Sequence, residues 1–359
     1  MKKLRVLVLC GGKSAEHSVS LVSARTVMAN LDRRRFEPKL VYIDSRGRWL
    51  AVRKDSLTNH VGASEKALMT GGQALTAVQR LSFAGENPDV VFPVLHGPLG
   101  EDGTVQGMLE LAGLPYVGCG VLGSALGMDK EVSKRLCIHA GLPILPYAVV
   151  RHPEHAPALA RRLGRPLFVK PARMGSSVGV SKVTKPAELM PAVREAFRYD
   201  DKIVLEKGIP APREIECAVL GDPWTKPGDP LELKASICGE IEANAEFYTY
   251  EAKYLDPEGA QLKVPAEIPE KTSKLVRDLA LRAFRVLDGY GMARADFLLD
   301  RKTGAIWFNV VNTIPGFTSI SMYPRLWKAS GVDTPELVHR LIQLALRRRR
   351  ARGRLKTAP

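Results

Sequence analysis

Cysteine is scarce in this sequence, and long apolar runs are missing from it. Five cysteines (Cys10, Cys119, Cys137, Cys217 and Cys238) are spread over 359 residues without a C-x-x-C pair. An odd, unpatterned set of thiols argues against a disulfide framework and favours a reducing compartment. No apolar stretch approaches the ~18 residues that a membrane-spanning helix needs. We therefore expect a cytoplasmic protein with no membrane partner.

The usual nucleotide-binding signatures are missing or out of place. The P-loop pattern G-x-x-x-x-G-K-[ST] does not occur. GCGVLG at 118–123 matches G-x-G-x-x-G, but it does not follow the first strand. No acidic residue closes a second strand about 20 residues later, as the dinucleotide fingerprint requires. Any nucleotide must therefore be held in another way.

Positive charge is in excess, with 53 Lys and Arg against 38 Asp and Glu and a net charge of +15. Seven of the basic residues lie in 347–356, where there is no acidic residue. We interpret this tail as a solvated helix end whose cations complement the helix dipole, so that its removal should leave the activity intact. A phosphate-binding tail with nucleic acid as the partner is less favoured, because no RRM-like, zinc-finger or helix-turn-helix pattern accompanies it.

Alternating strand and helix patterns predict an α/β fold of three units. Residues 1–121 should form an N-terminal unit around an open, mostly parallel sheet, with surface excursions over 46–84. Residues 122–220 should form a small central α+β unit, and residues 221–359 a C-terminal α+β unit with the basic tail. The expected strands are 5–10, 39–43, 90–95, 166–170, 179–183, 203–205, 215–220, 293–299 and 305–311, and the expected helices are 19–31, 130–140, 187–197 and one beginning at Asp333.

Two segments carry the chemistry. In KPARMGSSVGV at 170–180, a strand delivers Lys170 to a loop of small residues whose backbone N–H groups can close over phosphates. A plain β-hairpin turn is the alternative. Asp296 and Asn312 are oxygen ligands of the kind that Mg²⁺ accepts beside substrate phosphates, and Arg294 can stabilise developing negative charge. For these three residues, a buried polar network is the alternative.

Taken together, these motifs resemble those of the D-alanine–D-alanine ligases, which are ATP-grasp enzymes. The resemblance covers nearly the whole chain in order, and several motifs are specific to this group of ligases. They are GGKSAEHSVS at 11–20, LHGPLGEDG at 95–103, MDK at 128–130, the 170–180 loop, Glu206, REIE at 213–216, YEAKYLD at 250–256 and NVVNTIPGFTSISMYP at 309–324.

The resemblance implies which residues bind ATP. Lys130 and Lys170 would bind its phosphates, and Ser176 and Ser177 would cover them. The adenine and ribose contacts would come from Glu206, Lys207, Ile209 and Glu214. Asp296 and Asn312 would ligate Mg²⁺ or Mn²⁺.

The resemblance also implies the substrate contacts. Glu16 would hold the ammonium of the first D-alanine near His96. A loop at about 240–260 would form a lid, which a hydrogen-bonded set of Glu16, Ser176 and Tyr254 would lock. Lys253 would lie near the transferred phosphate. Arg294 and the N–H of Gly316 would form an oxyanion hole. Ser321 and Met322 would bind the carboxylate of the second D-alanine.

One position departs from the family pattern. Val310 stands where the family has a glutamate that bridges two metal ions, and valine cannot bind a metal. Three explanations remain open: a working ligase with one ion or water-mediated ligation, a weakened or inactive homologue that still binds ATP, or a deliberately altered form. Losing such a ligand costs roughly 10²–10⁴ in turnover. We favour a ligase with impaired or unusual metal binding.

The implied reaction joins two D-alanines to D-alanyl-D-alanine through a D-alanyl phosphate, with ATP as phosphoryl donor, for peptidoglycan synthesis. Tyr254 favours a dipeptide over D-alanyl-D-lactate, because ester-forming relatives lack that tyrosine. A D-alanine–D-serine ligase and a non-catalytic ATP-binding homologue are the alternatives. The resemblance also implies a homodimer.

Overall fold

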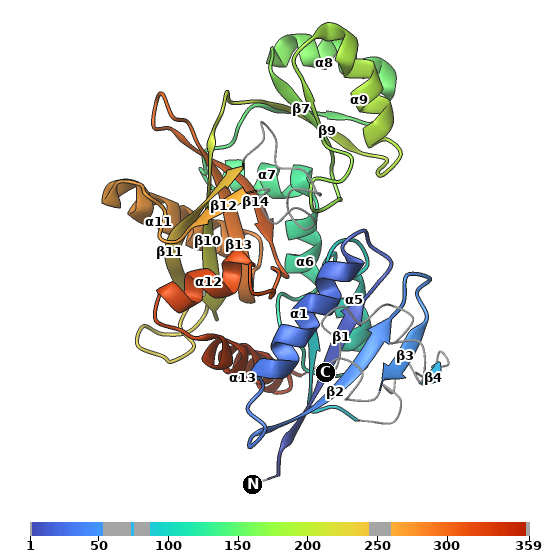
Figure 1. Cartoon of the computed structure of the whole chain (residues 1–359), viewed down its shortest axis with the longest axis vertical. Helices are drawn as coiled ribbons and strands as arrows, with labels where there is room; N and C mark the ends of the chain where they lie inside the picture. Colours follow the sequence, from blue (N-terminus) through green and yellow to red (C-terminus); the bar gives the residue numbers. More distant parts are fainter. Residues whose placement is uncertain (1, 53–72, 75–86, 244–259, 357–359) are drawn as a thin grey trace.

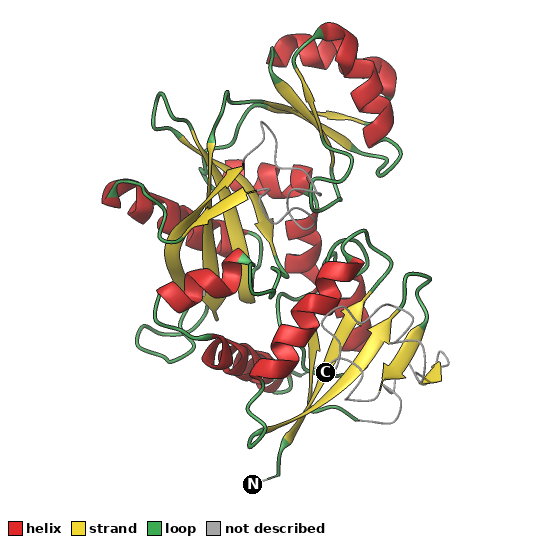
Figure 2. Ribbon diagram, in the orientation of Figure 1, coloured by secondary structure: helices red, strands yellow, loops and turns green. Residues whose placement is uncertain are grey.

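We analysed the protein as a computed structural model, which describes residues 2–52, 73–74, 87–243 and 260–356. Three sheets follow one another along the long axis of the molecule (Figures 1 and 2). The N-terminal sheet lies at one end, the C-terminal sheet in the middle and the central sheet at the other end. The mixed α/β class expected from the sequence is confirmed.

The N-terminal sheet is mixed, with a parallel centre. β1 pairs in parallel with β2 and β5, whereas β2–β3 and β3–β4 are antiparallel. In spatial order its strands are β4 (Gln73–Ala74), β3 (Trp49–Val52), β2 (Phe36–Ile43), β1 (Leu4–Gly11) and β5 (Val90–Pro93). The expectation that 46–84 is only a surface excursion is therefore wrong for β3 and β4. The run WLAV is too short to show strand periodicity before its pairing partner is known.

Both faces of this sheet are covered. Successive side chains of a strand point to opposite faces, so Val6 and Val8 pack toward α1 (His17–Asn30) and the C-terminal helix α13 (Thr334–Arg352), while Leu7 and Leu9 pack toward α5 (Thr104–Leu111). All four strand residues are buried. The parallel strands thus read as continuous apolar runs, as a sheet covered on both faces requires.

The central sheet has helices on one face and polar side chains on the other. Its strands in spatial order are β6 (Tyr147–Val150), β9 (Ile203–Lys207), β7 (Leu167–Pro171) and β8 (Ser181–Val183). Leu167 and Val169 pack with α8 (Ala156–Leu163) and α9 (Leu189–Ala196). Lys170 and Glu206 line a cavity on the opposite face.

The C-terminal sheet is antiparallel, and it takes one strand that we expected elsewhere. Its spatial order is β12 (Ala260–Lys263), β11 (Lys234–Ala243), β10 (Arg213–Gly221), β13 (Gly291–Leu299) and β14 (Ile306–Asn312). The strand expected at 215–220 in the central unit is thus β10, paired with β11 and β13. The sequence order misled us, because β10 follows β9 directly but crosses to the next sheet.

Helices join the sheets. α11 (Glu270–Val286) packs on one face of the C-terminal sheet, in a core that Cys137 of α7 (Lys130–His139) also enters. α6 (Val121–Met128) precedes α7, and α12 (Met322–Ala329) packs beside α13 under the other face of the sheet (Figure 1). Within the described residues, the other helical segments are the short 3₁₀ turns at Pro153–His155 and Pro186–Glu188. In the part of the chain described, no helix combines the length and the apolar character needed to cross a membrane.

The basic tail is not simply a solvated helix end. Arg348 is buried, and its Nη1 and Nη2 donate to the carbonyls of Gly118 and Tyr116 at 2.7 and 2.9 Å. Its guanidinium carbon also lies 4.2 Å from the centroid of the Tyr116 ring. Arg347 forms an ion pair with Asp229 at 2.9 Å. The first part of the tail therefore ties α13 to the N-terminal and C-terminal units, and our expectation is corrected here.

Candidate functional site

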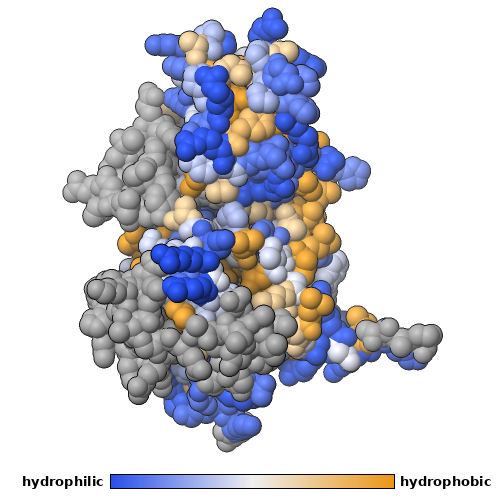
Figure 3. All heavy atoms as spheres, turned by 90° about the vertical axis from the view of Figure 1, so that its right-hand side faces the viewer, coloured by the Kyte–Doolittle hydropathy of each residue, from blue (hydrophilic) through white to orange (hydrophobic). Residues whose placement is uncertain are grey.

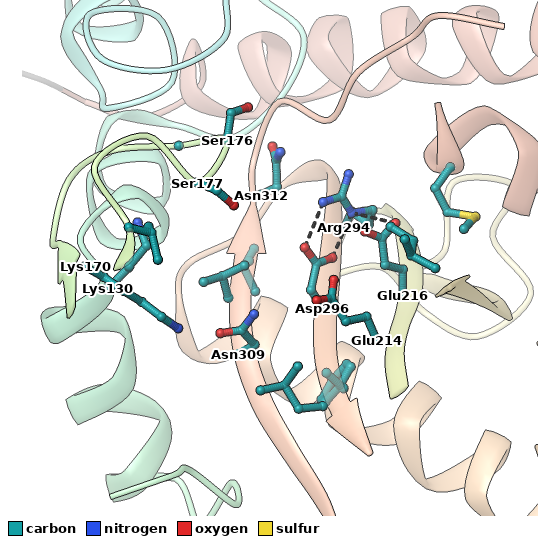
Figure 4. A pocket seen from close by; sticks show the side chains of 18 of the residues that line it. Lys130, Lys170, Ser176, Ser177, Glu214, Glu216, Arg294, Asp296, Asn309 and Asn312 are labelled. Atoms are coloured by element: carbon teal, nitrogen blue, oxygen red, sulfur yellow. Dashed lines mark hydrogen bonds and ion pairs between the residues drawn. The ribbon is translucent and has the colours of Figure 1, made fainter. Parts of the chain in front are cut away.

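A cavity of about 930 Å³ lies where the three units meet, and all three line it. Seventeen positions singled out from the sequence, Val310 included, line it together. They are Glu16, His96, Lys130, Lys170, Ser176, Ser177, Glu206, Lys207, Ile209, Glu214, Arg294, Asp296, Val310, Asn312, Gly316, Ser321 and Met322. Tyr254 and Lys253 lie outside the described residues. Positions far apart in sequence thus share one space, with the lysines on one side and Arg294 and Asp296 on the other (Figure 4).

At the lysine side, a buried carboxylate is held by two ammonium groups. Glu206 is 1% exposed and pairs with Lys170 and with Lys134 of α7. Burial raises the pKa of Glu206, but the charges of Lys134 and Lys170 outweigh this effect and hold it at about 2. Lys134 also lies 3.4 Å from the carbonyl of Asn309. Glu206 is therefore ionised, and Lys134 fixes it between the central sheet and β14.

Lys130 begins α7 at the same side of the cavity. Its ammonium donates to the carbonyl of Met174 in the 170–180 loop. Burial, followed by the charges of Lys170 and Lys134, lowers the pKa of Lys130 to about 8. An anion placed between these lysines would relieve their mutual repulsion. The cluster therefore has the electrostatics of a phosphate site.

The 170–180 loop reaches across the cavity to the N-terminal unit. Ser176 Oγ donates to the carboxylate of Glu16. Ser176 and Ser177 have φ values of 50° and 60°, so consecutive residues adopt the left-handed conformation. A Cβ at Gly175 would lie 2.8 Å from Glu16 Oε2, so a larger residue there would displace the Glu16 carboxylate. The strained loop and its close approach to Glu16 exceed what a plain hairpin turn needs.

His96 is a neutral link between two loops. Its Nδ1 lies 2.9 Å from the carbonyl of Ile314 and its Nε2 lies 3.3 Å from Ser23 Oγ. A carbonyl can only accept, so Nδ1 carries the proton. Burial lowers the pKa of His96, which keeps the ring uncharged. It therefore connects the 95–103 loop to the loop after β14.

Glu101 is a second buried carboxyl group near Glu16. Its Oε1 accepts the N–H of Gly97 at 2.9 Å. Burial, followed by the charge of Glu16, raises the pKa of Glu101 to about 8. At neutral pH, Glu101 is thus a protonated acid beside Glu16. A buried carboxyl group whose pKa is raised this far inside a cavity is typical of functional sites.

The opposite side of the cavity holds an arginine between two carboxylates. Arg294 Nε and Nη2 donate to the two oxygens of Asp296 at 2.7 Å each. Glu216 Oε2 lies 3.0 Å from Arg294 Nε. Glu216 and Asp296 are register partners on β10 and β13. The alternation of strand side chains thus places all three groups on one face of the sheet.

Val310 is the next position across the sheet. It is the register partner of Asp296 on β14, and the pairing then shifts, so that Phe297 faces Phe308 and Asn309 is the extra residue of a β-bulge. Bulges re-aim side chains next to active sites. Asn309, Val310 and Asn312 all line the cavity. The row Glu216–Asp296–Val310 therefore ends in an apolar side chain, at the position where the family resemblance predicts a carboxylate.

The far end of the cavity is the start of α12. Ser321 is its N-cap residue, and Ser321 Oγ lies 2.7 Å from Thr318 Oγ1 and accepts the N–H of Thr318 at 3.0 Å. A Cβ at Gly316 would lie 2.8 Å from Ser321 Oγ, so a larger residue there would displace the Ser321 hydroxyl. A helix N-terminus with free N–H groups favours a carboxylate.

Sequence reasoning missed three buried residues of the cavity region: Lys134, Glu101 and Glu216. Glu101 and Glu216 stand inside motifs that we quoted without giving these side chains a role. Lys134 lies one helical turn after Lys130, and this i, i+4 spacing puts both lysines on the same face of α7. That spacing was the available signal for Lys134.

The three-sheet fold, with a cavity that all three units line, superimposes on solved ligases of the ATP-grasp class, and this chain is therefore an ATP-grasp enzyme. Two sequence profiles match, "D-ala D-ala ligase N-terminus" over residues 5–119 and "D-ala D-ala ligase C-terminus" over residues 136–343. The chain belongs to the D-alanine–D-alanine ligase family.

Individual relatives agree along the whole length. The chain is 46% identical to a D-alanine–D-alanine ligase A from Chromobacterium violaceum, covering 98% of this chain and 97% of the relative. It is 48% identical to one from Bradyrhizobium diazoefficiens, with 99% and 98% covered. The solved D-alanine–D-alanine ligase of Coxiella burnetii superimposes with a TM-score of 0.83 at 34% identity, covering 98% and 97%. The VanG D-Ala:D-Ser ligase of Enterococcus faecalis gives 0.82 at 33%, covering 96% and 100%.

Proposed function

We propose that this protein joins two D-alanines to D-alanyl-D-alanine, with ATP converted to ADP and phosphate, to supply peptidoglycan synthesis. The observation that carries the proposal is the single cavity with lysines at one side, Glu16 and the 170–180 loop above it, and Arg294 with the start of α12 at the other side. Each of these groups can compensate a charge that a substrate or the transition state carries. The site residues named from the sequence take their roles here as part of this proposal.

At the lysine side, ATP would exchange with existing ion pairs. Lys130 and Lys170 would turn from Met174 and Glu206 to the phosphates, which compensate their charge. Lys134 would stay on Glu206, leaving one Glu206 oxygen to accept the adenine amino group. Lys207 and Ile209 would flank the base, and Glu214 would accept from the ribose hydroxyls. Ser176 and Ser177 would close over the phosphates.

At the other side, the substrates would meet the reacting phosphate. Glu16 would hold the ammonium of the first D-alanine, whose carboxylate would attack the γ-phosphate to give an acyl phosphate. The amine of the second D-alanine would then attack that carbonyl and expel phosphate. Arg294 and the N–H of Gly316 would stabilise the oxyanion. Ser321, Met322 and the start of α12 would bind the second carboxylate. Lys253 and Tyr254, by resemblance, would serve the phosphate and the lid.

The donor set at Asp296 fits one Mg²⁺ or Mn²⁺ ion. Mg²⁺ is usually bound by one or two carboxylates together with substrate phosphates, and Asp296 and Asn312 provide a carboxylate and an amide oxygen at the cavity wall. Such an ion would neutralise charge on the transferred phosphoryl group. Among the described residues, no cluster of three His, Cys, Asp or Glu side chains is placed to hold a metal. A carboxylate-bridged pair of ions lacks its ligand at Val310.

The test is phosphate release from ATP with Mg²⁺, with and without D-alanine, on this protein and its Val310→Glu variant side by side, with the product identified by mass spectrometry. Release that requires D-alanine, together with a dipeptide product, supports the ligase. If neither protein turns over while both bind ATP, the ligase proposal fails. The non-catalytic ATP-binding homologue, which Val310 favours, would then stand.

A second amino acid at the acceptor position is the alternative product. The structural likeness to the VanG D-Ala:D-Ser ligase favours testing D-serine as the second substrate, because few residues around Met322 would decide that specificity. Product identity with D-alanine, D-serine and D-lactate in parallel separates the cases. A dominant D-serine product would replace our assignment, and a D-lactate ester would contradict the role inferred for Tyr254.

A homodimer acting in the cytoplasm completes the proposal. Leu111 of α5 is 90% exposed and Leu122 of α6 is 57% exposed, and these two helices pack on each other. Hydrophobic residues also gather along one edge of the face shown in Figure 3. Exposed apolar groups of this kind support an interface. Sedimentation of the protein and of its Leu111→Lys variant tests the assembly.

A further inference from the structure

Glu216 has a position that the family motifs do not explain. It is buried on β10, lines the cavity and lies 3.0 Å from the Nε of Arg294. In the sheet it faces Asp296 across β10–β13, while Val310 faces Asp296 across β13–β14. Asp296 thus stands between a carboxylate on one side and an apolar side chain on the other.

Asp296 binds the Arg294 guanidinium and, in the proposed function, also a divalent cation. Both of its oxygens accept hydrogen bonds from the Arg294 guanidinium at 2.7 Å. The proposed function also makes Asp296 the carboxylate ligand of a divalent cation. A cation on Asp296 weakens its hold on a guanidinium, because the two positive groups compete for the same lone pairs and repel each other. Arg294 then needs a second anionic partner to stay at the cavity wall.

We propose that Glu216 is the positioning residue that holds Arg294 in place when Asp296 is engaged by the cation. This proposal rests on the proposed function, in which Arg294 stabilises the oxyanion of acyl transfer. Glu216 has the geometry for the role, because its oxygen already lies 3.0 Å from Nε, so the arginine can release Asp296 without leaving the site. The carboxylates then divide the two cations: Glu216 keeps the guanidinium, and Asp296 takes the ion.

The chain offers a matched control for this test. Glu240, on the neighbouring β11, is also buried and also pairs with an arginine, Arg213, at 2.6 and 2.7 Å. Neither Glu240 nor Arg213 lines the cavity. Glu240→Gln therefore removes a buried carboxylate charge from the same sheet without touching the site, whereas Glu216→Gln removes it beside Arg294.

The kinetic readout is the split between kcat and KM in full-length protein. Losing one oxyanion-hole donor lowers kcat by roughly 10²–10³, and loosening Arg294 should cost part of this, about tenfold in Glu216→Gln. The KM for ATP should stay within about twofold, because the nucleotide side is untouched. Glu240→Gln should leave kcat unchanged. Equal kcat values in both variants, or a loss confined to the KM for ATP and to thermal stability, would overturn the proposal.

A second readout does not depend on turnover. The Nε–H signal of Arg294, assigned in ¹⁵N NMR spectra with an Arg294→Lys variant, reports whether the guanidinium is held. On addition of Mg²⁺ and a non-hydrolysable ATP analogue it should stay sharp in the unaltered protein and broaden in Glu216→Gln. Identical spectra in the two proteins would contradict the role of Glu216. If the unaltered protein makes no dipeptide, the proposed function fails, and this spectrum still decides whether Glu216 holds Arg294.

Discussion

The two sides of the cavity differ in the charged partners that surround their buried carboxylates. At the lysine side, where ATP is proposed to bind (the nucleotide side), the negative charge of Glu206 is compensated by Lys134 and Lys170. At the opposite side, where the substrates are proposed to react (the reaction side), Arg294 pairs with both Asp296 and Glu216. Val310 follows Asp296 in the same row across the sheet. One side therefore has cations to offer an anionic ligand, and the other has carboxylate oxygens to offer a cation.

This difference indicates which side of the cavity should limit the reaction. At the nucleotide side, the Glu206 carboxylate already has two ammonium partners before any ligand enters. By the family resemblance, the reaction side lacks one expected carboxylate, because Val310 stands at its position. Binding of ATP should thus be normal, while the stabilisation of the transferred phosphoryl group should be deficient.

The sharpest way to break the contrast is Val310→Glu. Restoring a carboxylate next to Asp296 should raise turnover by roughly 10²-fold or more, since metal stabilisation is worth several kcal/mol and each ~1.4 kcal/mol is tenfold in rate. Affinity for ATP without Mg²⁺ should barely change. The measurement is kcat against Mg²⁺ concentration, with Val310→Gln as the uncharged control. A protein that is already fast and gains nothing from Glu would show that its metal site is built differently.

At the nucleotide side, the corresponding change is Lys134→Met. It leaves Glu206 with Lys170 as its remaining ammonium partner among the contacts described here. Glu206 keeps one ammonium partner, so losing the charged hydrogen bond from Lys134 should cost about 1.5–3 kcal/mol in the free energy of unfolding, which urea denaturation measures. Lys170 should also be held on Glu206 more firmly, so the KM for ATP should rise.

The double variant Lys134→Met/Glu206→Gln is the control for that experiment. Because it also removes the carboxylate from Lys170, the loss of stability that it adds to that of Lys134→Met measures the remaining Lys170–Glu206 pair. If the single variant is as stable as the unaltered protein, the Lys134–Glu206 pair does not act as described.

Much of the fold follows from local patterns, and its failures have a physical reason. The strands of β1, β2, β5, β13 and β14 and the cap of α13 at Asp333 were predicted, because buried apolar runs and an Asp before Thr-Pro are local signals. β10 was assigned to the wrong unit, because sheet membership depends on pairing partners distant in sequence. β3 was missed because four residues carry too little periodicity.

The candidate site was predictable where its residues form motifs and not where they act through neighbours. The sequence indicated Glu16, Lys170 and Arg294 by type and context, and the structure places them around one cavity. It did not show that Lys134 compensates Glu206 or that Glu216 touches Arg294, since such ion pairs arise only when strands and helices from different segments meet. The role of each site residue stays a prediction until measured.

The tail provides a similar contrast over three residues. Arg348 is buried against Tyr116 and Gly118, whereas Arg350 of the same helix is exposed. Arg348→Ala should lower the free energy of unfolding by about 1–3 kcal/mol, because two buried carbonyls lose their donors. Arg350→Ala should change it by less than about 0.5 kcal/mol. Thermal denaturation of both variants measures the difference, and equal melting temperatures would restore the picture of a solvated tail.

The smallest expected effect is a pH dependence at the nucleotide side. Lys130 in the free protein has a pKa of about 8 because of burial and of the charges of Lys170 and Lys134, partly offset by Asp200 and Glu101. A lysine whose folded pKa lies below its unfolded value of 10.5 destabilises the fold while charged, so stability should rise between about pH 8 and 10.5 as Lys130 loses its proton. Phosphate binding needs the charged form, so the KM for ATP should rise a few-fold above pH 8. Lys130→Arg stays charged throughout and should flatten this part of the profile. The pKa of Glu101 is also about 8. If the KM for ATP still rises above pH 8 in Lys130→Arg, the titrating group is Glu101 instead.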